Sequence, residues 1–277
     1  MQILLISLFC FFNTCVCIAQ QQYSTKYGDN PEAGHYAKIN GINLYYETYG
    51  NGHPLILLHG NGGSIEKQAD RIEYFKNYFH VIAVDSRRHG KSVDSSHIQL
   101  TYDRMTEDID ALLDSLHIDS AYVWGQSDGG ILGLLLAIRY PEKVGKLSTF
   151  AANLFPGKKA LFTEIDNLIR DTVKVTKDEQ RKQLYSLMAY QPDITAGQLK
   201  SIRCPVLIMT GDRDAIRLEH TLKMFYNIPN SNLFVMPGAT HFGAYAKTEL
   251  FNMVLLDFLT KPFSTMSSVE LFTGKKK

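Results

Sequence analysis

The sequence predicts an α/β fold with a mainly parallel central sheet and helices on both faces. Short apolar runs alternate along the chain with amphipathic segments that have a helical pattern. One of these runs, P-L-I-L-L at 54–58, is continuously apolar, which is typical of a strand covered on both faces. The chain of 277 residues is also long enough for one large domain with a single buried core.

The predicted elements follow one another in a regular order. Residues 36–39 and 42–49 flank Asn40-Gly41, a strong hairpin signal, so the domain should open with an antiparallel pair. Further strands are expected at 54–58, 81–84, 121–124, about 146–150, 205–209 and 233–236, and helices at about 66–78, 102–116, 128–140, 218–226 and 244–260. In such sheets, ligand-binding and catalytic residues lie at the carboxyl ends of the strands.

Residues 155–201 interrupt this alternation. They contain charged helical patterns at 158–173 and 178–190 and no convincing strand. We therefore expect a short helical cap inserted between two strands of one domain that spans residues 21–277.

Residues 1–20 resemble a secretory signal peptide. They contain no charged side chain and end in small residues, so that cleavage would fall near Ala19, although the usual Lys or Arg at the start is missing. A membrane anchor is the alternative, but Asn13-Thr14 interrupts the apolar run, which is shorter than the roughly 20 residues that a span needs. We expect an exported protein, periplasmic or secreted, without stable membrane insertion.

Charge and cysteine content argue against several classes of function. The formal net charge is +1 and neither sign dominates either half of the chain, so no nucleic-acid partner is expected. Removal of residues 1–20 would leave Cys204 alone among the four cysteines, before Pro205 and an apolar strand. Such a cysteine is typically a small buried hydrophobe, which disfavours thiol chemistry and cysteine-based zinc sites.

A short motif between a predicted strand and a predicted helix indicates nucleophilic catalysis. The segment G-Q-S-D-G at 125–129 matches G-x-S-x-G, the turn that lifts a serine hydroxyl above a sheet. Ser127 would need a histidine to take its proton and a carboxylate to orient that histidine. Loops after later strands offer Asp212 and Asp214 as acids and His241 as base.

The order serine, acid, histidine is similar to that of the α/β-hydrolase superfamily, and the resemblance extends from about residue 36 to 263. The stretches 59–64 and 85–92 also match the pattern of that superfamily. The resemblance implies that Ser127 is the nucleophile and His241 the base, and its G-x-x-D pattern favours Asp214 over Asp212 as the acid. Asp212 would then be a turn residue that bonds its own backbone. The alternative roles are a helix cap for Ser127 and a surface imidazole for His241.

The resemblance also implies an oxyanion hole made of two backbone N–H groups. These belong to Asp128, directly after the nucleophile, and to Asn61. The glycine-rich run at 60–63 could instead cradle a phosphate, but it lacks the Lys-Ser/Thr of a P-loop and the spacing of a dinucleotide motif. We expect no cofactor and no metal.

Asp128 occupies a position where hydrophobic residues are commoner in the superfamily. Valacyclovir hydrolase-like enzymes also carry S-D-G-G here, and this resemblance implies a carboxylate that binds a substrate ammonium. An acid in the first turn of a helix also gains up to ~1 kcal/mol from the helix dipole without any ligand. Both interpretations remain open.

The sequence therefore predicts a serine esterase that cleaves a small-molecule carboxylic ester or lactone through an acyl-enzyme on Ser127. The signal segment, the cap and Asp128 are compatible with amino-acid esters and with amino-sugar macrolides; the latter would make the protein similar to the serine macrolide esterases of antibiotic resistance. A C–C bond hydrolase, an aminopeptidase-type hydrolase and a non-catalytic small-molecule receptor on the same fold are the alternatives. The sequence is compatible with a monomer or a homodimer.

Overall fold

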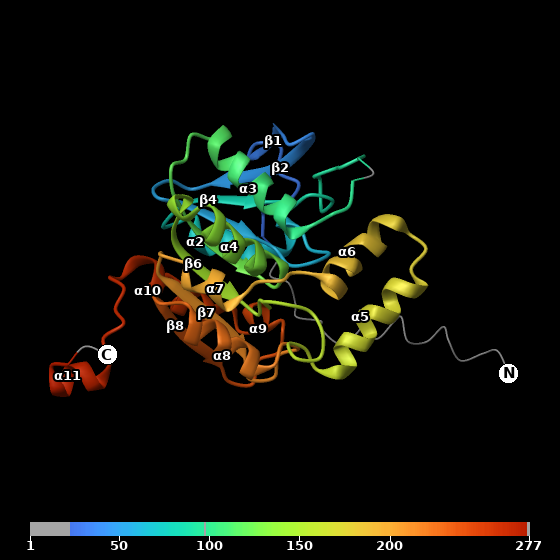
Figure 1. Cartoon of the computed structure of the whole chain (residues 1–277). Helices are drawn as coiled ribbons and strands as arrows, with labels where there is room; N and C mark the ends of the chain where they lie inside the picture. Colours follow the sequence, from blue (N-terminus) through green and yellow to red (C-terminus); the bar gives the residue numbers. More distant parts are fainter. Residues whose placement is uncertain (1–22, 97, 276–277) are drawn as a thin grey trace.

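A computed structural model describes residues 23–96 and 98–275, so the expected signal peptide at 1–20 lies outside the described residues. The strands are β1 (Gly34–Ile39), β2 (Ile42–Tyr49), β3 (Pro54–Leu58), β4 (His80–Val84), β5 (Ala121–Gln126), β6 (Val144–Phe150), β7 (Val206–Gly211) and β8 (Ser231–Met236). They form one sheet in the order β1-β2-β4-β3-β5-β6-β7-β8 (Figure 1). The pairs β1·β2 and β2·β4 are antiparallel and the others are parallel, which confirms the predicted sheet.

Helices cover both faces of this sheet. The main ones are α2 (Ala69–Phe75), α3 (Tyr102–Ser115), α4 (Asp128–Arg139), α8 (Leu218–Asn227) and α10 (Thr248–Thr260). Successive side chains of a strand point to opposite faces. Accordingly, Ile56 lies in an apolar cluster with residues of α3, α4 and α8, whereas Leu55 and Leu57 lie in a second cluster with residues of α2 and α10. The sheet is thus the middle of three layers.

The last predicted helix is divided in two. Lys247, with φ −128° and ψ 49°, separates α9 (Gly243–Ala246) from α10, because these angles are not helical. The helix predicted at 66–78 is shorter in the structure, where α2 covers only its middle part and a 3-10 turn, η2 (Ile65–Gln68), precedes it. A further helix, α11 (Ser268–Thr273), was not predicted, although its Ser267 and Glu270 form a capping box.

The insertion between β6 and β7 contains α5 (Thr163–Val175), α6 (Glu179–Tyr190) and α7 (Ala196–Lys200). Helices α5 and α6, which we call the cap, lie beside the sheet and pack on each other (Figure 1). They share a small apolar cluster that includes Ile169, Val173 and Ala189. Leu199 of α7 belongs instead to a core cluster of the sheet. Ile216, which follows β7, joins the same small cluster as the cap residues, and Leu187 of α6 joins the core cluster of the sheet. The cap is therefore packed onto the main domain through apolar side chains.

Cys204 lies buried in the larger core cluster. Burial raises the pKa of its thiol to about 12, so the group stays protonated at neutral pH. This agrees with the expected role as a small buried hydrophobe.

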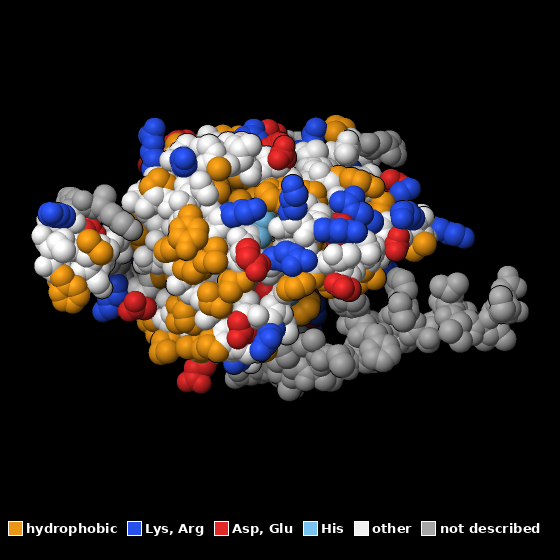
Figure 2. Space-filling view, turned by 60° about the horizontal axis from the view of Figure 1, so that its bottom comes forward, with side chains coloured by type: hydrophobic (Ala, Val, Ile, Leu, Met, Phe, Trp, Pro, Cys, Tyr) orange, Lys and Arg blue, Asp and Glu red, His pale blue; other side chains and the backbone are white. Residues whose placement is uncertain are grey.

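The surface carries side chains of several kinds. On the face drawn in Figure 2, hydrophobic side chains lie next to Lys, Arg, Asp and Glu side chains, and a histidine is visible between them. Among the helices of the described residues, none is long and apolar enough to cross a bilayer.

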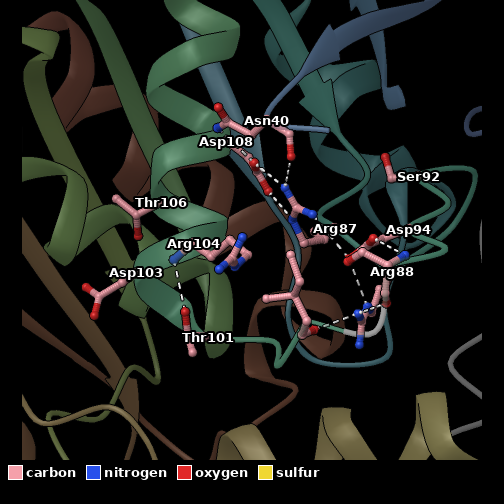
Figure 3. A network of polar contacts seen from close by, with 12 residues as sticks. Asn40, Arg87, Arg88, Ser92, Asp94, Thr101, Asp103, Arg104, Thr106 and Asp108 are labelled. Carbon is pink, nitrogen blue, oxygen red and sulfur yellow. Dashed lines mark hydrogen bonds and ion pairs between the residues drawn. The ribbon is translucent and has the colours of Figure 1, made fainter. Parts of the chain in front are cut away.

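A buried charge network anchors the loop that follows β4 (Figure 3). Arg87 donates from Nε to Asp108 Oδ2 at 2.7 Å and from Nη2 to Asp108 Oδ1 at 2.8 Å. It also donates from Nη1 to Asp94 at 3.1 Å. The side chains of Arg87, Asp94 and Asp108 are at most 2% exposed, so these charges depend on one another for compensation.

Replacement of Arg87 by Met is expected to lower the free energy of unfolding by about 3–5 kcal/mol, because Asp108 then loses the charge that compensates its burial. Urea denaturation followed by circular dichroism measures this loss. Arg139→Met is the control, since Arg139 pairs with Asp103 and Glu107 at the surface, where such pairs contribute about 0–1 kcal/mol. A loss no larger than that of the control would contradict the prediction.

Candidate active site

Ser127 connects β5 to α4 in a strained turn. Its φ of 52° lies in the left-handed region that side chains other than glycine avoid, and its ψ is −117°. The Ser127 N–H donates to the carbonyl of Phe150 at 2.8 Å, and the Ser127 carbonyl accepts from the N–H of Ile131 at 3.0 Å. These bonds to a neighbouring strand and to the following helix hold the strained backbone in place.

Two glycines allow this turn to sit close to the strands. A Cβ on Gly125 would lie 2.1 Å from the carbonyl oxygen of Gly129, and a Cβ on Gly129 would lie 2.1 Å from that of Leu58. Neither position has room for a methyl group, so the motif needs glycine on both sides of the serine.

The structure brings together the serine, histidine and acid that the sequence singled out. His241 Nε2 lies 3.0 Å from Ser127 Oγ, and His241 Nδ1 lies 2.8 Å from Asp214 Oδ1. The Asp214 side chain is fully buried and also accepts from the N–H of Ile216 at 3.0 Å and from Thr210 Oγ1 at 3.3 Å. This geometry allows the imidazole to take the serine proton while the carboxylate holds the ring in one tautomer.

Asp212 has a different role from Asp214. It is exposed, and its Oδ1 accepts from the backbone N–H of Ala239 at 3.2 Å. The sequence predicts a hydrogen bond of Asp212 within its own turn. In the structure, the Asp212 carboxylate instead links the loop after β7 to the loop that carries His241.

The neighbouring charges favour a carboxylate beside an imidazolium. Burial raises the pKa of Asp214, but the charge of His241 and the hydrogen bonds from its ring and from Ile216 outweigh burial, and the pKa falls below its usual value. Burial lowers the pKa of His241, but Asp214 outweighs it, and the pKa of His241 rises above 6.5.

The value of kcat/KM is expected to rise with pH along an acid limb whose midpoint lies above the usual pKa of an imidazole, because His241 must be neutral to accept a proton. A pH–rate profile of the wild type measures this midpoint. Asp214→Asn removes the charge that raises the pKa of His241, so the imidazole ring should titrate at lower pH in that variant. Because turnover of the variant is slow, NMR of the ring measures this titration. An unchanged ring titration would contradict the argument.

The two predicted oxyanion residues contact each other beside Ser127. Asp128 directly follows Ser127, and Asn61 Nδ2 donates to Asp128 Oδ2 at 2.8 Å. A Cβ on Gly60 would lie 3.2 Å from the Ser127 Cβ, which places the loop at 60–63 against the serine. Asn61 Nδ2 also donates to the carbonyl of Leu184 in α6 at 2.9 Å. The sequence did not predict this link to the cap, because it depends on where α6 packs.

The loop after β4 positions the Asn61 loop. The N–H of Ser86 donates to His59 Nε2 at 3.0 Å, and His59 Nδ1 lies 2.8 Å from the carbonyl of Gly60. His59 Nε2 is thus an acceptor and Nδ1 carries the proton. Burial lowers the pKa of His59 to about 3, so the ring stays neutral. His59 therefore has a positioning role.

Asp128 is an enclosed carboxylate rather than an exposed one. It is 3% exposed, and burial raises its pKa to about 6 against the opposing effects of Asn61, Tyr102 and His241. At neutral pH it is therefore mostly ionised. Tyr102, at the start of α3, and Gln126, which donates to the carbonyl of His241 at 3.1 Å, were not predicted to lie at the site. Gln126 was within reach of sequence reasoning, since it directly precedes Ser127.

Comparisons with known proteins match this fold. Residues 53–170 match the protein-family model described as alpha/beta hydrolase fold. The serine hydrolase BPHL of Homo sapiens is 28% identical over 253 residues, which are 80% of this chain and 84% of that protein. A 2-hydroxy-6-oxononadienedioate/2-hydroxy-6-oxononatrienedioate hydrolase of Paraburkholderia phymatum is 27% identical over 262 residues, 79% of this chain and 91% of that protein. The crystal structure of the enol-lactonase from Burkholderia xenovorans LB400 superposes with a TM-score of 0.69 at 19% identity, covers 82% of this chain and all of that chain, and shows the shared fold.

Proposed function

Because the chain belongs to the α/β-hydrolase family and is a hydrolase, we propose that it cleaves a carboxylic ester or lactone through an acyl-enzyme formed on Ser127. The observation that carries this proposal is the pair of contacts that His241 makes with Ser127 Oγ at 3.0 Å and with Asp214 Oδ1 at 2.8 Å. A serine hydroxyl becomes a useful nucleophile when a base in this position removes its proton.

The reaction proceeds in two steps. Ser127 Oγ attacks the substrate carbonyl carbon while His241 Nε2 takes the hydroxyl proton, and the backbone N–H groups of Asn61 and Asp128 bind the oxyanion. His241 then gives the proton to the leaving alkoxide, the C–O bond breaks, and an acyl-enzyme remains. A water molecule, deprotonated by His241, attacks the carbonyl of the acyl-enzyme. His241 then returns the proton to Ser127 Oγ as the bond between this oxygen and the acyl carbon breaks, and the acid is released. Asp214 stabilises the imidazolium in both steps.

A substrate screen combined with covalent labelling tests this function. The wild type should hydrolyse short p-nitrophenyl esters and lose activity with a fluorophosphonate, and mass spectrometry should find the adduct on the peptide that contains Ser127. Absence of turnover together with absence of the adduct would favour the receptor alternative.

We further propose that the substrate carries an amine, as amino-acid esters and amino-sugar macrolide lactones do. Asp128 supports this idea because its ionised carboxylate directly follows the nucleophile and one of its oxygens is held by Asn61 at 2.8 Å. An ammonium on the substrate would compensate this enclosed negative charge.

Asp128→Asn is expected to lower kcat/KM for an aminoacyl ester by about 10- to 100-fold, since a hydrogen bond to a charged group contributes about 1.5–3 kcal/mol. The matched substrate is the same ester without its amino group, for which kcat/KM should change by less than about threefold. Equal losses of kcat/KM on both substrates would contradict the binding of a substrate ammonium by Asp128, but not the proposed ester hydrolysis.

Hydrolysis of a C–C bond is the second candidate. It is favoured by the relative from Paraburkholderia phymatum, whose name describes a hydrolase of 2-hydroxy-6-oxo dienedioates and trienedioates. A vinylogous 1,5-diketone is therefore included in the substrate screen. A higher kcat/KM for this diketone than for the esters would favour hydrolysis of a C–C bond, and a lower one would favour the ester hydrolase.

We also propose that the protein is exported. The support comes from the uncharged, largely apolar segment at 1–20. Mass spectrometry of the protein purified from cells that express the full chain should give a mature N-terminus near residue 20, and an intact Met1 would contradict export.

A further inference from the structure

A buried arginine on α2 contacts α10. Arg71 is fully buried, and its guanidinium lies 4.5 Å from the ring centroid of Phe251 and 5.9 Å from those of Trp124 and Tyr245. Its Nη1 donates to Asn252 Oδ1 at 2.9 Å. The guanidinium is therefore enclosed by aromatic rings and held from one side by a neutral amide.

The other edge of this guanidinium has no protein partner within the described residues. Both Nε and Nη2 of Arg71 are buried without an acceptor there. These two N–H groups point in the same direction and form the edge with which arginine binds a carboxylate through two parallel hydrogen bonds. The edge suited to an anion is thus the one left open.

Further donors without partners belong to neighbouring positions. Trp124 Nε1 and both amide atoms of Gln68 are buried and without an acceptor or donor among the described residues. Gln68 is the N-cap residue of α2 and precedes Arg71 by three residues. Four of these five unpartnered atoms, counting Arg71 Nε and Nη2, are N–H donors, which is the composition of a site for a negative ligand.

The charge of Arg71 is not compensated by direct contact. No carboxylate in the described part of the chain forms an ion pair with it, and the adjacent Asp70 accepts from Tyr23 at 2.9 Å and from Thr248 at 3.5 Å. Burial lowers the pKa of Arg71 to about 10 against the opposing effects of Tyr245 and Asp70, so it remains cationic at neutral pH. A buried charge without a direct partner is unfavourable, and an anion in contact with the guanidinium would compensate it more fully.

We propose that Arg71 and Trp124 hold a small monovalent anion, a halide or a short carboxylate, in an enclosed site that stabilises the fold. The anion would accept from Nε and Nη2 of Arg71 and from Nε1 of Trp124, the donors that the protein leaves open. The donors of this site belong to residues other than Ser127, His241 and Asp214, and the proposal does not depend on the proposed ester hydrolysis.

The sole tryptophan of the chain provides a local signal, because its indole N–H belongs to the proposed site. The full-length protein is titrated with sodium chloride, sodium bromide or sodium formate at constant ionic strength, with sodium sulfate as the balancing salt. We expect a saturable change in fluorescence excited at 295 nm, quenching by bromide, and a Tm rise of about 5 °C at 100 times Kd. Chloride and formate distinguish a halide site from a carboxylate site by their Kd values.

Variants and crystallography decide between an anion and water. In the variants Arg71→Gln and Trp124→Phe, the same Tm rise should need an anion concentration at least about tenfold higher than in the wild type. Arg139→Gln, which replaces an exposed arginine, should respond to the anion as the wild type does. Crystals grown in bromide should show an anomalous peak within hydrogen-bond distance of Arg71. A Tm without saturable anion dependence in the wild type, or a water at this position in bromide-grown crystals, would overturn the proposal even if Arg71→Gln fails to fold.

Discussion

Ser127→Ala is expected to reduce kcat for ester hydrolysis by about 10⁶-fold, the size of loss that removal of the nucleophile causes in serine hydrolases. The remaining activity comes from oxyanion binding and substrate positioning alone, because no group is left to form the acyl-enzyme. Steady-state hydrolysis of the best ester from the screen measures the loss. Tm should change little, since the substitution removes one hydroxyl, which contacts His241 at 3.0 Å.

A matched serine elsewhere in the sheet controls for indirect effects. Ser148 on β6 is fully buried and its hydroxyl contacts the sulfur of Met209 at 3.5 Å. Ser148→Ala should keep kcat within about twofold, because the Ser148 hydroxyl contacts Met209 rather than Ser127, His241 or Asp214. Equal activity of the wild type and Ser127→Ala would refute the covalent mechanism.

Asp214→Asn is expected to lower kcat by about 10⁴-fold, because an amide can no longer hold His241 in the tautomer that accepts the serine proton. Asp214 is buried and contacts His241 Nδ1 at 2.8 Å, so its role depends on the charge as well as on the position. The kinetics of the purified variant, together with its circular dichroism spectrum, separate lost chemistry from lost folding.

Asp212→Asn is the control for this second variant. The amide oxygen of asparagine can still accept from the N–H of Ala239, so kcat should fall by less than about fivefold. If Asp212→Asn were the more damaging change, the assignment of the acid would be wrong.

Much of the fold was predictable because its signals are local. A strand such as β3 is a short apolar run, and the turn at Ser127 is specified by the glycines on both sides of it. The contact between His241 and Ser127 follows from the parallel sheet, which brings the ends of β5 and β8 to the same edge. Residues far apart in the sequence could thus be assigned to one site.

The features that sequence reasoning missed depend on packing between distant segments. Nothing near Asn61 in the sequence indicates that its side chain meets α6, and nothing near Tyr102 indicates its position beside Asp128. The break at Lys247 also lies within a continuous amphipathic pattern, which gives no local reason for the helix to stop. The loss of the helical angles there is a property of the tertiary structure.

The bond between Asn61 and the cap has a consequence for how this enzyme can diversify. The acceptor in α6 is the backbone carbonyl of Leu184, which every amino acid provides. Side chains of the cap can therefore be exchanged by mutation while the loop next to Ser127 keeps its anchor. Substrate preference can drift among descendants of this chain without a concurrent redesign of the chemistry.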